Sequence, residues 1–472
     1  MVMSGRFYID GQWVDALSGQ TIDVLDPRTE CSIGSIGAAN AEDVDRAVRA
    51  ARRAFDGFAE LSRKDRRDLL GAVVAIYERR LDEVAEVISA EMGAPRTLAR
   101  AAHAPLGLIH FRTAYEEIEH FRFEREEGRL TLCREPIGVC GLITPWNWPA
   151  NQIAAKVAPA LAVGCTMVLK PSEISPYSAE IIARIIEEAG VPAGVFNLIQ
   201  GDGPTAGAAL SSHPEVDMVS FTGSTRGGIA VAQAAAPTIK RVHQELGGKS
   251  ANIILPDADF PVAVARGVRA VMNNSGQTCS APTRMLVPAD RMEEAKAIAA
   301  ETAAAIPIGQ EDQPGAMGPV VSEAQWNKVQ HLIGIGISEG AALVAGGEGR
   351  PEGFDAGYYV RPTVFADVRP DMTIAREEIF GPVLSILPYR DEEEAVAIAN
   401  DSDYGLAGFV DSQDLDHARR IARRLRVGQV RINHPPMHPL APFGGYKQSG
   451  NGREWGSQAF EEFTEVKAVV TP

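Results

Sequence analysis

Residues 138–170 read GVCGLITPWNWPANQIAAKVAPALAVGCTMVLK, and this stretch decides the fold class. A short apolar run (139–143) precedes a longer apolar segment with helical spacing (150–163) and a second short run (166–169). This order predicts a buried strand, a helix and another buried strand, the unit from which parallel sheets are built. Because the same alternation continues through 221 and returns between about 250 and 433, we predict an α/β protein with two doubly wound parallel sheets.

The remaining segments add helices and a ribbon to this pattern. Residues 7–13 predict a hairpin with an Asp-Gly turn, and apolar spacing predicts long amphipathic helices between 41 and 120. Residues 121–134 alternate charged and apolar side chains, which indicates an exposed ribbon. Since an exposed strand edge needs a partner, we expect the ribbon to contact another subunit.

Length and composition exclude several classes of protein. The 472 residues are too many for one core and predict two or three domains. A net charge of −16 argues against nucleic acid or an anionic membrane as partner. The longest apolar run, 157–169, is too short to span a bilayer, and the first ten residues do not resemble a secretory signal. The five scattered cysteines form no CxxC pair, which indicates free thiols, a cytoplasmic location and no metal site.

One cysteine lies in a setting that suits a nucleophile. Cys279 ends the stretch Asn-Asn-Ser-Gly-Gln-Thr-Cys, and its neighbours Gly276 and Ser280 leave room for a substrate. The reactive form of cysteine is the thiolate, which needs an environment that favours the anion. A lone cysteine is more often a small buried apolar residue, so this assignment depends on the other motifs.

Two of these motifs follow predicted strands of the first sheet. Asn147, in Thr-Pro-Trp-Asn-Trp-Pro, offers an amide donor that can stabilise an oxyanion. Lys170 and Glu173, in Lys-Pro-Ser-Glu, can bind ribose hydroxyls, and a carboxylate there would repel a 2′-phosphate and favour NAD over NADP. Taken alone, each motif also fits an ordinary turn or a solvated ion pair.

Two further motifs complete the set. The stretch Phe-Thr-Gly-Ser-Thr-Arg-Gly-Gly (221–228) opens a predicted helix, where free backbone N–H groups attract phosphate, although it lacks the GxGxxG pattern. Glu245, in Gln-Glu-Leu-Gly-Gly-Lys-Ser, can act as a general base if partial burial raises its pKa. A surface carboxylate is the simpler interpretation of Glu245 by itself.

Together the motifs resemble the aldehyde dehydrogenase superfamily, of the hydrolytic type that does not acylate CoA. The family order is completed by Glu-Glu-Ile-Phe-Gly-Pro (377–382) and Pro-Phe-Gly-Gly-Tyr-Lys-Gln-Ser-Gly (442–450). The resemblance implies an NAD-binding domain (1–117 and 137–247), a catalytic domain (248–448) and a small β oligomerisation segment (118–136 and 449–472). It also implies a homodimer or a homotetramer built as a dimer of dimers.

The resemblance implies NAD-dependent oxidation of a small-molecule aldehyde to the carboxylic acid. Cys279 matches the nucleophile, Glu245 the base that activates water, Asn147 the oxyanion donor and Glu454 a second carboxylate in proton relay. The expected NAD contacts are Ile143, Thr144, Pro145, Trp146, Lys170, Ser172, Glu173, Gly203, Phe221, Gly223, Ser224, Leu246, Gly247, Glu378 and Phe380. The expected substrate tunnel is lined by Trp148, Gln152, Ala155, Thr278, Ser280 and Phe443.

Three alternatives stay open at this point. A CoA-acylating dehydrogenase would not need Glu245, a silent family member would not need the whole set, and a cysteine hydrolase would need a histidine near Cys279. Ala155 stands where many hydrolytic members have an aromatic residue, which predicts a roomier tunnel. Because no arginine can be placed at the tunnel from the sequence, aldehydes that carry a carboxylate are disfavoured.

Overall fold

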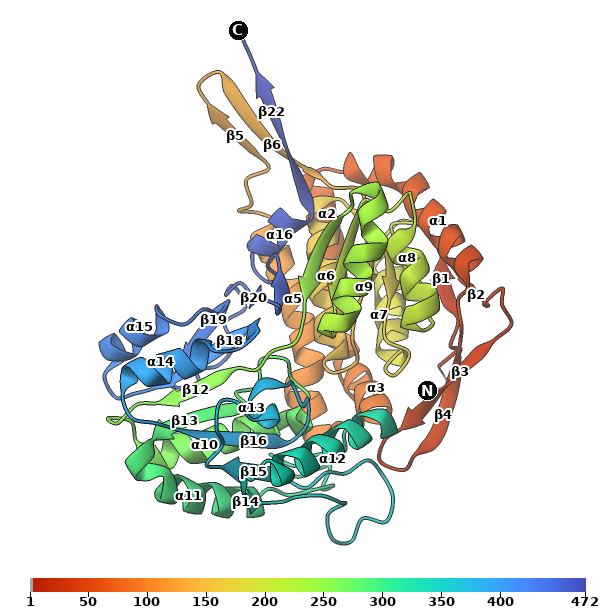
Figure 1. Cartoon of the computed structure of the whole chain (residues 1–472). Helices are drawn as coiled ribbons and strands as arrows, with labels where there is room; N and C mark the ends of the chain where they lie inside the picture. The colour runs from red at the N-terminus through yellow and green to blue at the C-terminus, as the bar shows by residue number, and fades with distance from the viewer. Residues whose placement is uncertain (1–2) are drawn as a thin grey trace.

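Two mainly parallel sheets form the centres of two lobes, and a narrow ribbon projects from the molecule (Figure 1). The computed structural model describes residues 3–472. The first sheet has the order β2-β1-β9-β8-β7-β10-β11-β21, in which β9 to β11 run parallel and the outer strands antiparallel. Its strands are β1 (Phe7–Ile9), β2 (Gln12–Val14), β7 (Val139–Ile143), β8 (Thr166–Lys170), β9 (Phe196–Leu198), β10 (Met218–Thr222), β11 (Arg241–Glu245) and β21 (Gly450–Asn451).

Helices cover both faces of this sheet, because alternate strand residues point to opposite sides. Cys140 and Leu142 belong to one apolar core with the larger set of helices, whereas Val139 and Ile143 belong to another core with α1 and α8. The helices of this lobe are α1 (Ala41–Ala59), α2 (Arg63–Arg79), α3 (Leu81–Met92), α4 (Arg96–Leu98), α5 (Ala104–Glu117), α6 (Pro149–Val163), α7 (Tyr177–Glu188), α8 (Ala208–Ser212), α9 (Thr225–Ala235) and α16 (Gln458–Glu462). The doubly wound arrangement predicted from 138–221 is confirmed.

The second sheet has the order β14-β15-β16-β13-β12-β18-β19 and is parallel except for β14. Its strands are β12 (Ala251–Ile254), β13 (Arg284–Pro288), β14 (Ala342–Ala345), β15 (Thr363–Ala366), β16 (Val383–Tyr389), β18 (Ala407–Asp411) and β19 (Gln429–Ile432). The helices α10 (Phe260–Met272), α11 (Met292–Ala304), α12 (Glu323–Ser338), α13 (Thr373–Arg376), α14 (Glu392–Asn400) and α15 (Leu415–Ala422) pack around it.

Helix α6 connects the two strands that decided the fold class. All fifteen of its residues are buried, because it is covered by α5, by the sheet and by the other helices of the lobe. A helix that is apolar on every side requires such a position. It begins at Pro149, directly after the Thr-Pro-Trp-Asn-Trp turn, and carries the buried Lys156.

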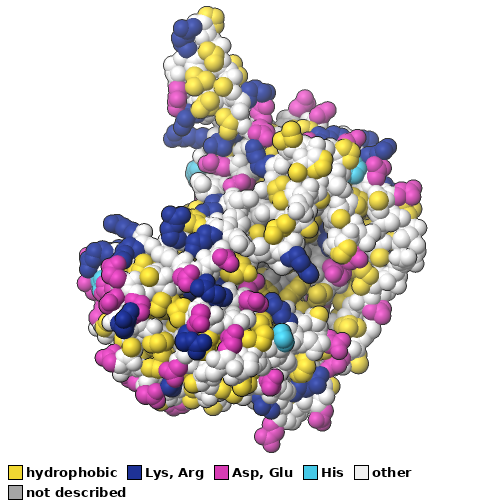
Figure 2. Space-filling model, viewed as in Figure 1, with side chains coloured by type: hydrophobic (Ala, Val, Ile, Leu, Met, Phe, Trp, Pro, Cys, Tyr) yellow, Lys and Arg dark blue, Asp and Glu magenta, His cyan; other side chains and the backbone are white. Residues whose placement is uncertain are grey.

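The ribbon predicted from residues 121–134 is present and has three antiparallel strands. β6 (Leu130–Pro136) lies between β5 (Glu124–Glu127) and β22 (Thr464–Val470) and pairs with β22 along its whole length. Figure 2 shows hydrophobic side chains on its surface among lysines and arginines. Val466 and Val470 are 57% and 72% exposed, so the ribbon presents an apolar surface to its surroundings.

The segment 449–472 is divided among three places, whereas we expected it to belong as a whole to the extension. Gly450–Asn451 pairs with β11 at the edge of the first sheet, α16 packs on α6, and only Thr464–Val470 joins the ribbon. Two short antiparallel pairs complete the chain: β3 (Thr21–Asp26) with β4 (Cys31–Gly37), and β17 (Tyr404–Gly405) with β20 (Tyr446–Lys447).

Candidate active site

The loop before Cys279 has an unusual backbone. Residues 274–276 have φ of 51°, 56° and 72°, and a Cβ at position 276 would overlap the carbonyl oxygen of Gly381. Non-glycine residues in this region cost about 1–3 kcal/mol each, so other contacts must hold the loop. Gln277 supplies one of them, because its Oε1 accepts a hydrogen bond from the backbone N–H of Val321 (2.8 Å). The strained loop ends at the half-buried Cys279.

The thiol of Cys279 is held in its neutral form by its surroundings. Burial raises its pKa, and the carboxylates of Glu378 and Glu245 raise it further, whereas the backbone N–H of Ser280 acts in the opposite direction. Because the thiolate is the nucleophile, this cysteine needs a positive charge or a proton acceptor nearby before it can react.

Asn147 lies in the wall of the same cavity as Cys279. Its Nδ2 donates one hydrogen bond to the carbonyl oxygen of Gln277 (3.0 Å), and its own carbonyl accepts one from Asn274 Nδ2 (2.9 Å). Since an amide nitrogen carries two hydrogens, one remains free to donate to a substrate oxygen. The Thr-Pro-Trp-Asn turn and the nucleophile loop, 130 residues apart, are thereby fixed to each other.

Glu245, the last residue of β11, is a buried carboxyl without a hydrogen-bond partner among the described residues. Burial and the negative charge of Glu454 raise its pKa well above the ordinary value, while Lys156 and Arg453 act against this shift. A raised pKa and two free oxygens suit a group that must take a proton from water near neutral pH.

A cavity of about 190 Å³ joins the two lobes at this point. Eleven of the predicted site residues line it: Pro145, Trp146, Asn147, Gln152, Gly223, Ser224, Leu246, Gly247, Cys279, Glu378 and Phe380. The strand ends of the first sheet and the nucleophile loop of the second therefore contribute to one site.

The start of α9 gives this cavity a phosphate-binding character. Ser224 caps the helix, and its Oγ accepts a hydrogen bond from Gly227 N (3.1 Å). Gly223 precedes it, and a Cβ there would collide with the ring of Phe221. The exposed N–H groups at the start of this eleven-residue helix can bind a pyrophosphate.

Glu378 and Phe380 lie in the opposite wall of the same cavity. Glu378 Oε1 accepts from Gly248 N (2.9 Å), and any side chain at Gly247 would collide with this carboxylate. Phe380 stands edge-on to Trp146, with ring centroids 5.4 Å apart. These residues fit the dinucleotide that the sequence predicts.

Two residues of α12 that the sequence did not reveal hold this wall in place. Gln325 Nε2 donates to the carbonyl of Phe380 (2.9 Å), a residue with φ of 58°, and Lys328 Nζ donates to the carbonyl of Glu378 (2.8 Å). They lie one helical turn apart in a segment without a recognisable motif, so only the packing of α12 identifies them.

The residues predicted for the adenosine end lie outside this cavity. Lys170 Nζ donates to the carbonyls of Pro171 and Gly201 (2.8 and 2.7 Å) and lies 3.8 Å from Glu173 Oε2. The buried lysine thus fixes the half-exposed carboxylate at the end of β8. Also outside the cavity, near the same strand ends, are Ile143, Thr144, Ser172, Gly203 and Phe221.

Comparison with known proteins agrees with this site. The model of the aldehyde dehydrogenase family matches residues 13–469. This chain belongs to the aldehyde dehydrogenase family. A curated relative, 3-succinoylsemialdehyde-pyridine dehydrogenase of a Pseudomonas species, is 56% identical over 467 residues, 98% of each chain.

Solved aldehyde dehydrogenases have the same fold. A mutant of aldehyde dehydrogenase C from Pseudomonas syringae, in complex with NAD+ and octanal, has a TM-score of 0.97 and 54% identity, covering 98% of this chain and 96% of that chain. An NAD+ complex of an aldehyde dehydrogenase from Bacillus cereus has a TM-score of 0.95 and 39% identity, covering 99% and 96%. The family and the fold predicted from the motifs are confirmed.

On the substrate side of this dehydrogenase, the space beside Ala155 is filled. Ala155, Phe443 and Trp455 form one buried apolar cluster against Cys279 and Met437, and the rings of Phe443 and Trp455 stack 4.7 Å apart. The cavity next to Ala155 measures only about 10 Å³. The space left by the small side chain at 155 is thus occupied in part by Trp455.

A larger cavity of about 740 Å³ lies on the other side of the nucleophile loop. Thr278 and Ser280 line it together with Arg266, Arg269, Arg431 and His434, and its lining includes no carboxylate. Three arginines that could not be placed from the sequence thus lie near two of the expected tunnel residues. The position of Arg431 could not be predicted, because strand β19 meets the nucleophile loop only in the folded chain.

The predicted tunnel residues are distributed around these cavities. Trp148 Nε1 donates to Thr278 Oγ1 (3.0 Å), and the Trp148 ring stacks on His103 at 4.0 Å. Gln152 lines the cofactor cavity, whereas Thr278 and Ser280 line the outer cavity. The loop that carries Cys279 therefore lies between the two cavities.

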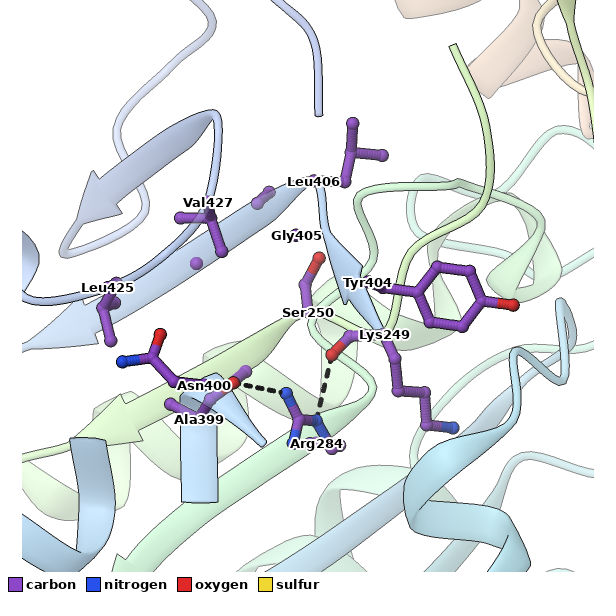
Figure 3. Close-up of a pocket in the computed structure, with 13 residues that line it drawn as sticks. Lys249, Ser250, Arg284, Ala399, Asn400, Tyr404, Gly405, Leu406, Leu425 and Val427 are labelled. Atoms are coloured by element: carbon purple, nitrogen blue, oxygen red, sulfur yellow. Dashed lines mark hydrogen bonds between the residues drawn. The ribbon is translucent and has the colours of Figure 1, made fainter. Parts of the chain in front are cut away.

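A small hollow beside Lys249 has a structural role (Figure 3). Arg284 lines it and donates to the carbonyls of Lys249, Ile398 and Ala399 (2.8–2.9 Å), which gives the last carbonyls of α14 hydrogen-bond partners. The hollow has a volume of about 10 Å³, which is too small for a ligand.

Residues 3–472 lack two features that other enzymes use. No helix there is long and apolar enough to cross a bilayer. No group of three or more His, Cys, Asp or Glu side chains is arranged to hold a metal ion in the same part of the chain.

Proposed function

We propose that this aldehyde dehydrogenase converts an aldehyde and NAD+ to the carboxylic acid and NADH through a thioester on Cys279. The observation that carries this proposal is one cavity in which Cys279, the free N–H of Asn147 and the start of α9 meet. Glu245 lies close enough to influence the pKa of the cysteine. The relatives that crystallise with NAD+ support the choice of cofactor.

In the first half-reaction, Cys279 Sγ adds to the carbonyl carbon as the thiolate. Asn147 Nδ2 and the backbone N–H of Cys279 donate to the oxygen that becomes negative, which lowers the barrier most when the donors are already in place. NAD+, when bound, accepts a hydride from that carbon. Collapse of the oxyanion then leaves a thioester on Cys279.

In the second half-reaction, Glu245 takes a proton from water while the water oxygen attacks the thioester carbon. The C–S bond breaks, the acid leaves, and Cys279 returns as the thiolate. Splitting the oxidation into two covalent steps replaces one high barrier with two lower ones. Glu454, paired with Lys156 next to Glu245, is the residue placed to share the proton.

NAD rather than NADP is the proposed cofactor. Glu173 lies beside Lys170 at the end of β8, where the family binds the adenosine ribose. A carboxylate there accepts a hydrogen bond from a 2′-hydroxyl and repels a 2′-phosphate. The enzyme should therefore prefer NAD.

The outer cavity favours an aldehyde that carries a hydrogen-bond acceptor or a negative charge away from the reacting carbon. Arg269 and Arg431 have no ion-pair partner among the described residues, whereas Arg266 pairs with Asp411. The relatives' names mention substrates as different as a succinoyl semialdehyde of pyridine and octanal, so they do not decide between charged and neutral aldehydes. Unpaired arginines in a chain of net charge −16 support the charged class.

The ribbon is the proposed contact between subunits. Its exposed valines and the free edge of β5 suit pairing with a second copy. We expect two or four subunits to assemble through it.

The experiment that tests the function follows NADH release and product identity together. Aldehydes of graded size and charge are offered with NAD or NADP, with and without CoA, in water enriched in oxygen-18. We expect equal amounts of NADH and acid without CoA, with at least one labelled oxygen in each acid molecule, because water supplies the oxygen that cleaves the thioester. NADH formed only with CoA would indicate the acylating alternative, and no NADH with any aldehyde would indicate a silent family member.

A further inference from the structure

His243 is a buried histidine beside the proposed base, and neither half-reaction uses it. It stands two residues before Glu245 in β11, so both side chains lie on the same face of the strand. His243 Nε2 lies 3.6 Å from Glu245 Oε1, and the two side chains are 1% and 3% exposed. Neither atom has a hydrogen-bond partner among the described residues.

The contacts on the other side of the ring decide which nitrogen carries the hydrogen. Lys156 Nζ donates to Ser220 Oγ (2.9 Å), so the hydrogen of Ser220 must point elsewhere. His243 Nδ1, at 3.4 Å from Ser220 Oγ, is the acceptor within reach. Burial and the charge of Lys156 lower the pKa of His243 to about 4, so the ring is neutral near pH 7. A neutral ring that accepts at Nδ1 carries its hydrogen on Nε2, facing Glu245.

We propose that His243 is a positioning residue for Glu245, whose carboxylate receives the Nε2–H while Lys156 and Ser220 fix the tautomer. The proposal rests on Glu245 acting as the base for thioester hydrolysis. A separation of 3.6 Å is longer than a hydrogen bond, but catalytic bonds often shorten only when the substrate is bound.

The role of this donor follows from the charges around Glu245. Glu454 and Glu462 disfavour its ionised form, as does burial, whereas Lys156 and Arg453 favour it. A donor aimed at the carboxylate stabilises the ionised form, which is the only form that can take a proton from water. His243 thus keeps Glu245 in the ionised form that acts as a base. It also orients the Oε1 atom of Glu245 toward the histidine ring.

The test compares two substitutions of similar size. His243→Gln keeps an N–H near the position of Nε2, whereas His243→Leu removes it. Each variant is acylated in a single turnover with NAD and an aldehyde, and decay of the acyl-enzyme is followed by intact mass from pH 5 to 9. Because one pKa unit corresponds to a tenfold change, we expect His243→Leu to move the acid limb up by about one unit and slow decay about tenfold at pH 7.

The formation of NADH in the same turnover should be unchanged in both variants, and His243→Gln should decay within about threefold of the parent. Ser220→Ala removes the hydroxyl that fixes the tautomer of His243 and changes the side-chain volume only slightly. Decay of the acyl-enzyme should be several-fold slower in this variant. Thermal unfolding of each variant shows that the fold is intact.

Two results would overturn the role of His243. One is a parental pH profile in His243→Leu, and the other is equal impairment of the Gln and Leu variants, which would indicate packing alone. Glu245→Gln separates this failure from failure of the proposed function. Slow decay in Glu245→Gln with normal decay in His243→Leu removes only the histidine from the mechanism, whereas normal decay in both removes Glu245 as the base.

Discussion

Lys156 Nζ lies 2.6 Å from Glu454 Oε1, and the two side chains are 0% and 3% exposed. The residues are 298 positions apart, one on α6 and the other just after β21. Burial alone would raise the pKa of Glu454, but the charge of Lys156 and the hydrogen bond from its Nζ bring it below its ordinary value. Glu454 is therefore ionised beside Glu245, which contributes to the raised pKa of the proposed base.

Removing one member of this pair should destabilise the protein strongly. Lys156→Met leaves a buried carboxylate without its partner, and such changes cost about 3–5 kcal/mol of the free energy of unfolding. Urea unfolding measures the loss. Lys156→Met combined with Glu454→Gln should recover much of it, and Arg49→Met, which breaks an exposed pair with Asp45, should leave the midpoint unchanged. Equal stability of Lys156→Met and the parent would show that the pair has no structural role.

The same pair predicts opposite pH dependences of stability in two proteins. In the parent, the folded pKa of Glu454 is lowered, so its contribution is present above the ordinary carboxyl pKa and is lost as the pH falls through the folded value. In Lys156→Met, burial without the lysine raises that pKa, so stability falls as the pH rises instead. Melting temperatures from pH 3 to 8 should therefore rise with pH below the ordinary carboxyl pKa in the parent and fall with pH above it in Lys156→Met, most clearly in the difference between the proteins. Parallel curves would contradict the assignment.

Cys279→Ala should abolish formation of NADH and acid while leaving NAD binding intact. The sulfur forms the covalent bond, but the cavity that faces the cofactor is built mainly by other residues. NAD binding is measured by calorimetry and activity by absorbance. Cys31→Ala, at an exposed cysteine, is the matched control and should retain full activity. An active alanine enzyme would exclude Cys279 as the nucleophile.

Glu245→Gln should separate the two half-reactions. The amide cannot take a proton from water, so the thioester should accumulate after a normal first turnover. Stopped-flow absorbance should show a full burst of NADH, followed by turnover at least tenfold slower than in the parent. If the burst disappears with the turnover, Glu245 acts before hydride transfer, contrary to the proposal.

Arg431→Gln should change the preference of the enzyme for charged aldehydes. Burial lowers the pKa of this arginine and ionisation of Cys279 would raise it, so the guanidinium lies within electrostatic reach of the nucleophile. A hydrogen bond to a charged group contributes about 1.5–3 kcal/mol, which corresponds to at least tenfold in kcat/KM. That loss should affect a carboxylate-bearing aldehyde and spare its methyl ester. An equal loss for both would indicate a change in shape only.

Replacing the exposed valines of the ribbon should alter assembly. Val466→Asp with Val470→Asp places charges on one face of β22 that would be buried between subunits, which disfavours association. Light scattering after gel filtration should show a smaller particle than the parent. Leu17→Asp, at another exposed apolar residue, should leave the mass unchanged. The mass of the parent itself distinguishes two subunits from four.

Much of the fold could be predicted because its signals are local. The alternation of short apolar runs with helical spacing in 138–221 reports which residues are buried, and these strands and helices are present close to their predicted bounds. The division of 449–472 could not be predicted in the same way. Its short strand pairs with β11 and its last strand with β6, and both partners lie far away in the sequence.

The sequence by itself determined the family, the order of the strands and helices, and the chemistry-bearing residues of the motifs. Each of these can be recognised from residues that are neighbours in the sequence, so none requires the tertiary structure to be known. The tertiary structure alone decided the pairing of Lys156 with Glu454, the filling of the space beside Ala155 by Trp455, and the arginines near the nucleophile loop. These depend on side chains from distant segments meeting where water is excluded, and packing and charge interactions act on distance in space, whatever the separation along the chain.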